Sequence, residues 1–364
     1  MTRPKAHGDA GERSEEPPRV MSEVRSSVGE SMDLPTVSVV VSTRDRAPFL
    51  GDLFRALESQ TLGRELFEVI VVDDGSRDGT WERLVEIAES SPLRYLALRL
   101  DRSLGQGTGR NIGIQEARGE IIALTDDDCI PAAAWLEQLT SQFFGDTTTG
   151  HTRMVVQGRT EPWSGDIVGA GPWDRTLWVL GPTWRFETCN IAYRRVDLAN
   201  AGGFPRRDEV PTASSGKLVG EDALLGWRVI EQGAELVFNR DAVAYHRHLP
   251  GSYKSWVLER RGTAAFPALM KLSPLARRGL WARWFLAQRT AAFDLTLVGV
   301  LLTVLTRRPW WLAAAVPWAR MALPEARYRG GRHPAVRLAQ LAIGDLVSFS
   351  CLAVASARSR SVVL

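Results

Sequence analysis

The chain has 364 residues, of which 45% are hydrophobic and 24% are charged, enough to bury a core in one large domain or two smaller ones. This balance excludes collagen-like, mucin-like and wholly disordered proteins. The three cysteines show neither a disulfide framework nor the Cys/His spacing of a zinc site. The first 18 residues contain no apolar signal-peptide stretch, which favours a reducing, cytosolic setting.

The net charge of +3 is unevenly distributed along the chain. Residues 1–34 carry a net charge of −2, are rich in Glu, Arg, Ser and Pro, and are predicted to be a disordered leader. Residues 35–253 carry −8, whereas residues 254–364 carry +13. An acidic body followed by a strongly basic end indicates two kinds of partner rather than a feature of the fold.

From Val37 onward, apolar β-branched runs alternate with segments of helical spacing. The spacing of roughly 25–30 residues indicates βαβ units, and therefore an α/β fold with a mainly parallel sheet. The predicted strands lie at 37–42, 67–76, 93–100 and 120–128, with helices at 50–60, 80–90 and 111–117 between them.

After Pro131 the pattern becomes less regular, with a long Gly/Pro-rich loop expected at 202–220. Beyond residue 250, helical segments studded with Arg and Trp continue to the end of the chain. We therefore predict an α/β domain at 35–250 and a helical basic and apolar region at 251–364. The other elements predicted after Pro131 are strands at 154–163, 189–195 and 234–246 and a helix at 221–233.

Three consecutive aspartates, Asp126, Asp127 and Asp128, directly follow an apolar strand. In extended or turn geometry Asp126 and Asp128 point the same way, so they can share one cation. Magnesium prefers carboxylate oxygens and bridges to phosphates. A solvated acidic turn is the alternative, but a second strand that ends in Asp73 and Asp74 favours a site, because parallel strands end at one ligand-binding edge.

Two further segments contain residues that suit a nucleotide or phosphate. Asp73 can accept a hydrogen bond from a base or ribose, although the Asp-Gly-Ser run is also ordinary turn chemistry. The run LGQGTGRNIG lacks the dinucleotide fingerprint, because Arg110 stands where the third glycine is required. Arg110 is either a charge-assisted clamp at a helix start, facing bound metal and phosphates, or a surface arginine.

Acidic and imidazole groups also occur late in the α/β domain. Glu221 and Asp222 begin a predicted helix after the long loop, where acids are also favoured by the helix dipole alone. His246 ends a predicted strand and is either a ligand or a histidine satisfied within the fold. Taken singly, neither motif defines a function.

Six motifs in chain order resemble family-2 glycosyltransferases with the GT-A (Rossmann-like) fold, over about Val37 to His248. The resemblance implies inverting transfer of a sugar from a nucleotide-diphosphate sugar to an acceptor hydroxyl, with Mg2+ or Mn2+. The motifs are SVVVSTRDRAPFL, FEVIVVDDGSRDGT, GRNIGIQEARGEIIALTDDDCIP, CNIAYRRVDLANAGGF, GEDALLGWR and YHRH.

The resemblance assigns a role to particular residues by their positions in these motifs. Asp222 falls on the catalytic base, and Asp126, Asp128 and His246 fall on metal-binding positions. Arg44 departs from the family, since an aromatic residue that stacks on the base is common there. The nucleotide-sugar-binding positions are Ser42, Arg44, Asp73, Arg110 and Asp126.

The resemblance further implies a UDP-sugar as the favoured donor and a carbohydrate or lipid-linked acceptor, in cell-envelope glycan, glycolipid or similar glycoconjugate synthesis. The QxxRW motif of processive synthases is absent from the sequence, which disfavours polymerisation. Two other classes stay open at this point. A sugar nucleotidyltransferase would have little use for the Glu221–Asp222 helix, and a catalytically silent, membrane-recruited binding module would not need the acids.

The basic region at 251–364 contains six tryptophans and two apolar runs, at 295–305 and 338–356. Neither run is a comfortable membrane span, which needs about 20 uninterrupted apolar residues. Trp and Arg beside short apolar helices predict association with the cytoplasmic face of a membrane, peripheral or shallowly inserted. True spans and a folded helical cap are the alternatives. Nucleic acid is not expected, because the arginines alternate with apolar runs.

Overall fold

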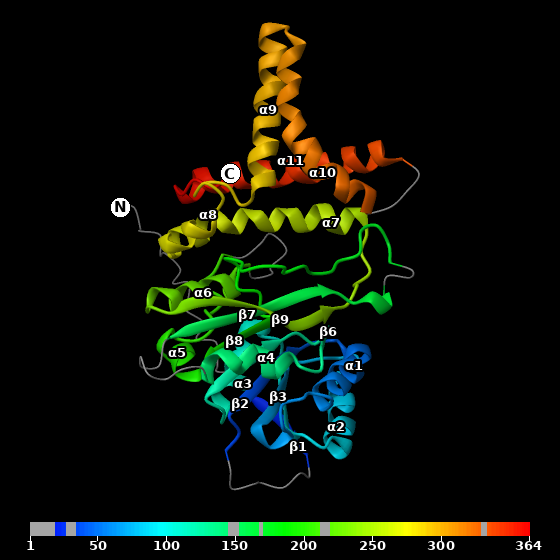
Figure 1. Ribbon diagram of the computed structural model, residues 1–364, viewed down its shortest axis with the longest axis vertical. Coiled ribbons are helices and arrows are strands. Elements are labelled where there is room, and N and C mark those ends of the chain that lie inside the picture. Colours follow the sequence, from blue (N-terminus) through cyan, green and yellow to red (C-terminus); the bar gives the residue numbers. More distant parts are fainter. Residues whose placement is uncertain (1–18, 27–33, 145–152, 167–169, 212–218, 329–332) are drawn as a thin grey trace, which may run out of the picture.

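A nine-stranded mixed β-sheet forms the centre of this computed structural model, which describes residues 19–26, 34–144, 153–166, 170–211, 219–328 and 333–364 (Figure 1). Its strand order is β1-β4-β3-β2-β5-β8-β7-β9-β6. The strands are β1 Val20–Arg25, β2 Val37–Thr43, β3 Phe67–Asp73, β4 Arg94–Leu100, β5 Ile121–Thr125, β6 Cys129–Pro131, β7 Met154–Pro162, β8 Asn190–Arg194 and β9 Glu235–His246.

The predicted α/β class is confirmed, and the sheet is mixed. Strands β2, β3, β4 and β5 pair in parallel, as do β7 and β9. Strand β8 runs antiparallel to both β5 and β7, and β6 runs antiparallel to β9. The βαβ spacing that indicated parallel strands ends after β5, so sequence periodicity could not give the direction of the later strands.

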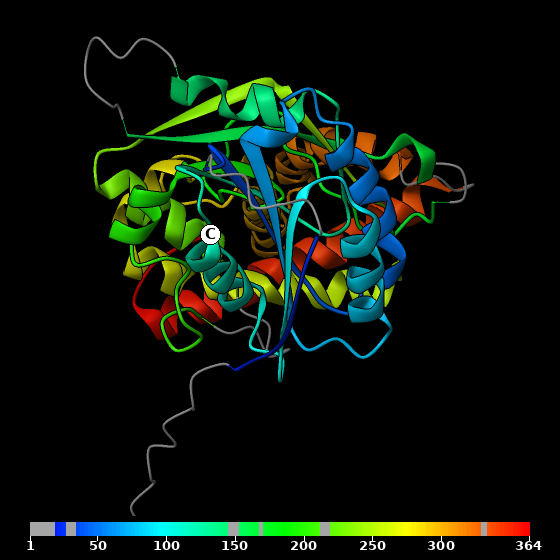
Figure 2. The ribbon, with the colours of Figure 1, turned by 90° about the horizontal axis from the view of Figure 1, so that it is seen from below.

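Helices cover both faces of the sheet because successive residues of its central strands point to opposite sides. Val39 packs with α1, α2 and α4, whereas Val40 packs with the layer that contains α3, α5 and α6. Figure 2 shows α1 and α2, in blue to cyan, on one side of the sheet and α3 on the other. These helices are α1 Ala47–Glu58, α2 Thr80–Ser90, α3 Gln106–Glu116, α4 Trp135–Ser141, α5 Arg195–Asn200 and α6 Glu221–Glu231.

The leader predicted to be disordered over 1–34 contains a strand. Residues Val20–Arg25 form β1 and pair antiparallel with β4. The prediction was wrong for this segment because the strand is held by backbone pairing at the end of the sheet, which requires little hydrophobic periodicity. Residues 1–18 and 27–33 of the leader, and 212–218 of the predicted long loop, lie outside the described residues.

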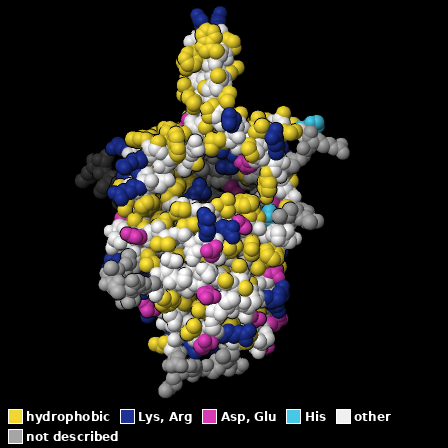
Figure 3. Space-filling model, viewed as in Figure 1, with side chains coloured by type: hydrophobic (Ala, Val, Ile, Leu, Met, Phe, Trp, Pro, Cys, Tyr) yellow, Lys and Arg dark blue, Asp and Glu magenta, His cyan; other side chains and the backbone are white. Residues whose placement is uncertain are grey.

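The described part of residues 251–364 is mostly helical, as predicted, and lies across one side of the sheet body. In Figure 1, α7 and α11 run crosswise above the body, and α9 projects away from it. Figure 3 shows a hollow between these helices and the body. The helices are α7 Tyr253–Glu259, α8 Phe266–Leu272, α9 Gln288–Thr306, α10 Val316–Tyr328 and α11 Pro334–Ser359, with 3-10 helices η5 Arg260–Ala265, η6 Pro274–Gly279 and η7 Pro309–Ala315 between them.

The C-terminal helices share apolar cores with the α/β body. Leu269 and Met270 of α8 belong to the core that contains Leu224 of α6. Trp256 of α7 packs on Trp173 of the body, with ring centroids 4.8 Å apart. The boundary near residue 250 is therefore crossed by buried apolar contacts.

Helix α9 and the returning η7 form a projecting hairpin. Gly299 allows their close approach, since a Cβ there would lie 2.5 Å from the carbonyl oxygen of Trp311. Leu301, Val304 and Leu305 are 56%, 70% and 69% exposed. Figure 3 shows the hairpin as largely hydrophobic with Lys or Arg side chains at its tip.

Two helices of the described chain, α9 and α11, are long and apolar enough to cross a membrane by length and composition. Only 17% and 22% of their apolar windows are buried, unlike the core helix of a soluble protein. The helices are also longer than the apolar runs that the sequence analysis considered, with 19 and 26 residues. This finding keeps both an interfacial and a spanning arrangement open.

Candidate active site

The carboxyl ends of β2 and β3 lie side by side, with Thr43 opposite Asp73 in the parallel register. Ser42 is buried at 3% exposure, and its hydroxyl has no hydrogen-bond partner among the described residues. Gly109 of α3 lies directly over that hydroxyl, where any Cβ would clash with Ser42 Oγ. Helix α3 therefore covers the carboxyl end of β2.

Asp73 ends β3 and Asp74 follows it, and the two acids accept hydrogen bonds from different segments of the chain. Asp73 is fully buried and accepts the backbone N–H of Ser76 at 2.9 Å, and its burial raises its pKa. Asp74 accepts the backbone N–H groups of Leu104 at 2.6 Å and Gly105 at 3.0 Å. Both acids therefore hold local structure, as the turn interpretation expected. The role of Asp73 in donor binding stays a prediction.

Arg44 lies at the open edge beside this turn. Its Nη1 donates to Ser103 Oγ at 2.6 Å, and Ser103 Oγ donates to Asp74 Oδ2 at 2.7 Å. Half of the Arg44 side chain, 51%, is exposed, so its guanidinium is accessible from solvent. The structure gives Arg44 a polar anchor where the family commonly has an aromatic ring.

Arg110 is the centre of the acidic cluster. Its Nη2 donates to Asp126 Oδ1 at 2.7 Å, and its Nη1 lies 3.5 Å from Asp222 Oδ1 and 3.8 Å from Glu221 Oε1. The side chain is 2% exposed, and its guanidinium lies over the ring of Phe204. Burial by itself would lower the pKa of Arg110. The neighbouring carboxylates together have the larger effect and raise the pKa. The chain thus brings acids from β5 and α6 to one permanent cation.

The position of Arg110 differs from the predicted helix start. Helix α3 begins at Gln106, so Arg110 lies one turn inside the helix. The glycines before it belong to the helix, because Gly107 and Gly109 pack closely against Glu221 and Ser42. Close packing therefore accounts for Gly107 and Gly109, whereas Gly105 precedes the helix with a left-handed φ of +98°.

Asp222 lies in the first turn of α6 and faces the cluster. Thr188 Oγ1 donates to Asp222 Oδ2 at 3.1 Å, and 29% of the Asp222 side chain remains exposed. Burial raises the pKa of Asp222 to about 7, although Arg110 opposes this shift. A carboxylate with a pKa near neutrality that is still open to solvent is suited to accepting a proton.

Asp128 and His246 face one another across the antiparallel pair β6 and β9. His246 Nε2 lies 3.5 Å from Asp128 Oδ1, while His246 Nδ1 lies 2.8 Å from the carbonyl oxygen of Arg247. Burial raises the pKa of Asp128, and the His246 imidazole opposes that shift. The contact to the Arg247 carbonyl favours a proton on Nδ1, which leaves Nε2 free to act as a ligand.

The donor set fits a small divalent cation held in part by substrate. No group of three or more His, Cys, Asp or Glu side chains converges as a metal site in the described part of the chain. Asp128 and His246 form a two-donor pair, and Asp126 faces Arg110 instead. Magnesium is commonly held by one or two carboxylates while phosphates and water complete its shell. The predicted ligands Asp128 and His246 are compatible with that arrangement, while the role of Asp126 as a ligand stays a prediction.

Three residues of the site were not singled out from the sequence. Arg46 Nε lies 3.5 Å from Asp127 Oδ1, and its Nη2 lies 3.9 Å from Asp128 Oδ2. Asp127 is buried, and burial raises its pKa to about 7. Thr188 orients Asp222. Arg46 stands in the STRDR motif and could have been noticed there, whereas nothing in the sequence distinguishes Thr188.

Comparisons with known proteins identify the family of the chain. The model of "Glycosyl transferase family 2" matches residues 38–201. "Glycosyltransferase AglE" of Haloferax volcanii is 37% identical over 247 residues, which are 62% of this chain and 76% of that protein. "Dolichol-phosphate mannosyltransferase" of Pyrococcus furiosus is 27% identical over 128 residues, 35% of this chain and 36% of that protein.

A solved structure has a similar fold. The mannosyltransferase PcManGT from Pyrobaculum calidifontis, in complex with GDP-Man and Mn2+, aligns with a TM-score of 0.53 and 20% identity. The alignment covers 90% of this chain and 88% of that one.

The sheet and these comparisons define a glycosyltransferase of the GT-A fold. The chain belongs to glycosyl transferase family 2.

Proposed function

We propose that this enzyme transfers a sugar, with inversion, from a nucleotide-diphosphate sugar to an acceptor hydroxyl. The observation that carries the proposal is the convergence of Asp126 and Asp222 on the buried guanidinium of Arg110. Asp126 follows strand β5, on the side where the donor would bind, and Asp222 lies in the first turn of α6, on the side of the acceptor. The donor and the acceptor would therefore meet at this cluster. The cluster places three carboxylates around one guanidinium, so a divalent cation would be needed to bring the anionic diphosphate of the donor to this edge.

The donor would be bound at the edge formed by the ends of β2, β3 and β5. In this proposal its binding residues are those predicted from the motifs. The half-exposed guanidinium of Arg44 would supply positive charge toward the nucleotide, and the buried Arg110 would hold Asp126 in position beside it. Asp126, Asp128 and His246 would hold Mg2+ or Mn2+, which stabilises the negative charge that develops on a diphosphate leaving group. The Mn2+ and GDP-Man bound to PcManGT support the class of donor and cofactor.

Asp222 would act as the general base. Its pKa of about 7 is high enough for an effective base and low enough for a large ionised fraction at neutral pH. As the acceptor oxygen attacks the anomeric carbon, its proton would move to Asp222 and the nucleoside diphosphate would leave from the opposite face. Thr188 and Arg110 would keep the carboxylate aimed at the acceptor.

The acceptor is proposed to be a carbohydrate or a lipid-linked molecule reached from the cytoplasmic face of a membrane. The exposed apolar hairpin of α9 and η7 supports association through 251–364, peripheral or shallowly inserted. A relative named for dolichol phosphate supports a lipid-linked acceptor and a role in cell-envelope glycan, glycolipid or similar glycoconjugate synthesis.

A donor screen tests this function. The purified full chain with Mn2+ would be assayed against UDP-, GDP- and dTDP-sugars for release of nucleoside diphosphate and for thermal shift. We expect release with one nucleotide class, and the Asp222→Asn variant should bind the same donor without comparable release. UDP-sugars remain the first prediction, although PcManGT carries GDP-Man.

Three outcomes would contradict the proposal. Release of pyrophosphate from a nucleoside triphosphate and a sugar phosphate would identify a nucleotidyltransferase instead. Donor binding without turnover on any acceptor fraction, including extracted lipid, would favour a silent binding module. Turnover by Asp222→Asn equal to that of the unaltered enzyme would show that Asp222 is not the general base.

A further inference from the structure

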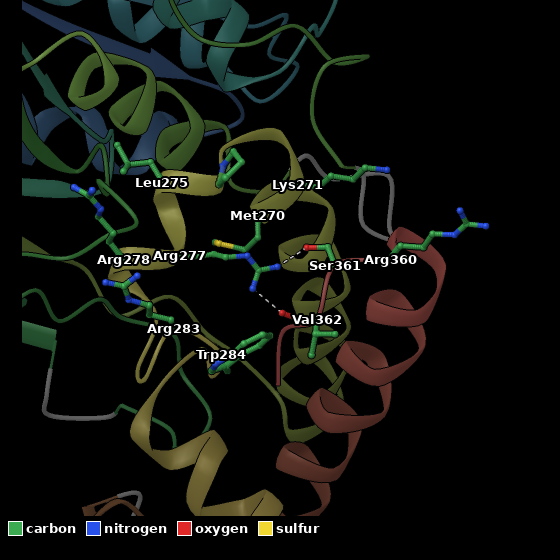
Figure 4. Close-up of a pocket in the computed structure, with 11 residues that line it drawn as sticks. Met270, Lys271, Leu275, Arg277, Arg278, Arg283, Trp284, Arg360, Ser361 and Val362 are labelled. Atoms are coloured by element: carbon green, nitrogen blue, oxygen red, sulfur yellow. Dashed lines mark hydrogen bonds between the residues drawn. The ribbon is translucent and has the colours of Figure 1, made fainter.

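A cavity of about 680 Å³ lies between α8, η6, the segment before α9 and the chain end after α11 (Figure 4). Five of its lining side chains are cationic and, among the described residues that line it, none is acidic. In Figure 4 Arg278 and Arg283 lie on one side of the cavity, and Lys271 and Arg360 lie on the other. The fifth cation, Arg277, lies between them. Such a concentration of one charge attracts an anion.

The structure does not neutralise these cations internally. Across the described chain, no ion pair joins Lys271, Arg278, Arg283 or Arg360 to an acid. The acids Glu325 and Asp345 of the C-terminal region both pair with Arg289, and neither lines the cavity. The positive charge around the cavity is therefore available to an external group.

The cavity wall is fixed by specific hydrogen bonds. Arg277 donates to the carbonyl oxygen of Val362 at 2.8 Å and to Ser361 Oγ at 2.7 Å. The chain end is bound in turn to the segment before α9, with Leu364 N–H donating to the carbonyl oxygen of Trp284 at 2.8 Å. These bonds hold the C-terminal residues across one side of the cavity.

Two of the cationic residues also have an unusual backbone conformation. Arg283 has φ +65° and Arg360 has φ +53°, both in the left-handed region that non-glycine residues seldom adopt. Arg360 is the C-cap of α11, where a left-handed residue commonly ends a helix, and Arg283 follows Ala282, φ +49°, in a turn. Both arginines therefore project from tight turns of the chain that border the cavity.

The same cavity has an apolar side. Met270, Leu275 and Val362 line it, and Trp284, 52% exposed, lies at its rim beside Arg277. Trp284 immediately precedes the segment that leads into α9, at the foot of the exposed apolar hairpin. Basic and hydrophobic side chains gather at this end of the molecule in Figure 3. An occupant with an anionic head and a hydrocarbon tail matches both surfaces.

We propose that this cavity binds the phosphate headgroup of an anionic membrane lipid, with the hydrocarbon chain directed along the α9 hairpin. Guanidinium groups pair well with phosphate oxygens, and the tryptophan suits the headgroup level of a bilayer. The inference rests on the membrane association in the proposed function. It adds a specific site, separate from the Arg110 cluster, that would fix the enzyme's orientation on the membrane.

The test compares two full-length double variants with the same charge change. Arg278→Glu/Arg283→Glu alters the cavity, and Arg320→Glu/Arg327→Glu alters exposed arginines of α10 outside it. Binding is measured by co-sedimentation with phosphatidylcholine vesicles, with and without phosphatidylglycerol. We expect the cavity variant to lose roughly tenfold or more in affinity for the anionic vesicles, and the α10 variant to lose much less. Neutral vesicles should not distinguish the two.

Further measurements separate the outcomes. Thermal unfolding checks that each variant folds, and Arg278→Gln/Arg283→Gln replaces the glutamate variant if that one does not. Equal losses in both double variants would overturn the specific site and leave general electrostatic binding. Calorimetric binding of inorganic phosphate that depends on Arg278 and Arg283, with vesicle binding unchanged, would overturn the lipid source.

The results that would contradict the proposed function differ from those that would contradict this inference. No binding of the unaltered chain to either vesicle would overturn membrane association and this inference together. Sugar transfer would still be measured separately by nucleoside diphosphate release in the absence of vesicles. Release by the cavity variant should equal that of the unaltered enzyme there, because neither arginine belongs to the acidic cluster.

Discussion

The acidic end of the sheet and the basic C-terminal region differ in whether their cationic side chains are paired with acids inside the fold. In the first, Arg110 is buried among three carboxylates, so its positive charge is compensated inside the fold. In the second, arginines line an open cavity while leucines and valines of α9 are exposed. Matched buried charges position one another, whereas unmatched surface charges and exposed apolar groups indicate an external partner.

The comparison predicts that substitutions at the acidic end change chemistry, while those in the C-terminal region change location. This division would be wrong if a substitution at the acidic end changed membrane binding, or if a substitution in the C-terminal region changed turnover. They run from the largest expected effect to the smallest.

Replacing Asp128 should have the largest effect. Asp128→Ala removes one member of the Asp128–His246 donor pair, so we expect transfer to be abolished together with metal-dependent donor binding. Calorimetry with and without Mn2+ measures the donor affinity, and thermal unfolding checks the fold. Unchanged donor affinity with retained metal dependence would show that the ligands lie elsewhere.

Replacing Asp222 should affect turnover but not donor binding. Loss of a general base costs about a hundredfold or more, so Asp222→Asn should lower kcat by at least that factor. Donor affinity, measured by thermal shift or calorimetry, should stay close to that of the unaltered enzyme. A parallel fall of both quantities would indicate that Asp222 belongs to the donor site.

Polar substitutions on α9 should affect membrane binding alone. Replacing Leu301, Val304 and Leu305 by Ser removes exposed apolar area, and we expect about a tenfold or greater loss of vesicle binding that high salt does not mimic. A control triple variant replaces Met21, Leu34 and Val196, which are also exposed but lie in the body. If the control lost as much, the hairpin would not be the membrane contact.

The pH dependence should give the smallest effect. With a pKa of about 7 for Asp222, kcat should rise about tenfold per pH unit below that value and level off above it, since the ionised form is the base. The Thr188 hydroxyl stabilises the ionised form, so Thr188→Val should raise the pKa and move the profile to higher pH. Thr303→Val, on the projecting hairpin, should leave the profile unchanged.

Sequence patterns predicted the parallel strands well because each of them has a signal of its own. The runs before Thr43, Asp73 and Thr125 are apolar and β-branched, and a strand buried on both faces requires that composition. The later strands do not alternate one to one with helices, since β5 and β6 are joined by a loop and two helices separate β8 from β9, so their pairing and direction depend on contacts distant in sequence. Strand β1 had no composition signal, and it was missed.

The residues of the candidate site were predicted by motif, but their contacts were not. Arg110, Asp126 and Asp222 are separated widely in the chain, and only the fold shows that one guanidinium joins them. The burial that raises the pKa of Asp222 is likewise a property of the packed structure. The basic cavity escaped notice because its cations come from α8, η6, the segment before α9 and the chain end.

Strand β1 has a consequence for how the protein behaves in solution. It covers β4, whose sequence RYLALRL is apolar and would otherwise present an open row of backbone N–H and C=O groups. An uncovered strand of this kind is a template for edge-to-edge association between molecules. With β1 in place, the outermost strand instead carries Glu23 and Arg25, whose charges discourage such pairing. Removing residues 1–26 should therefore leave the active-site geometry intact and produce concentration-dependent aggregation, visible by light scattering.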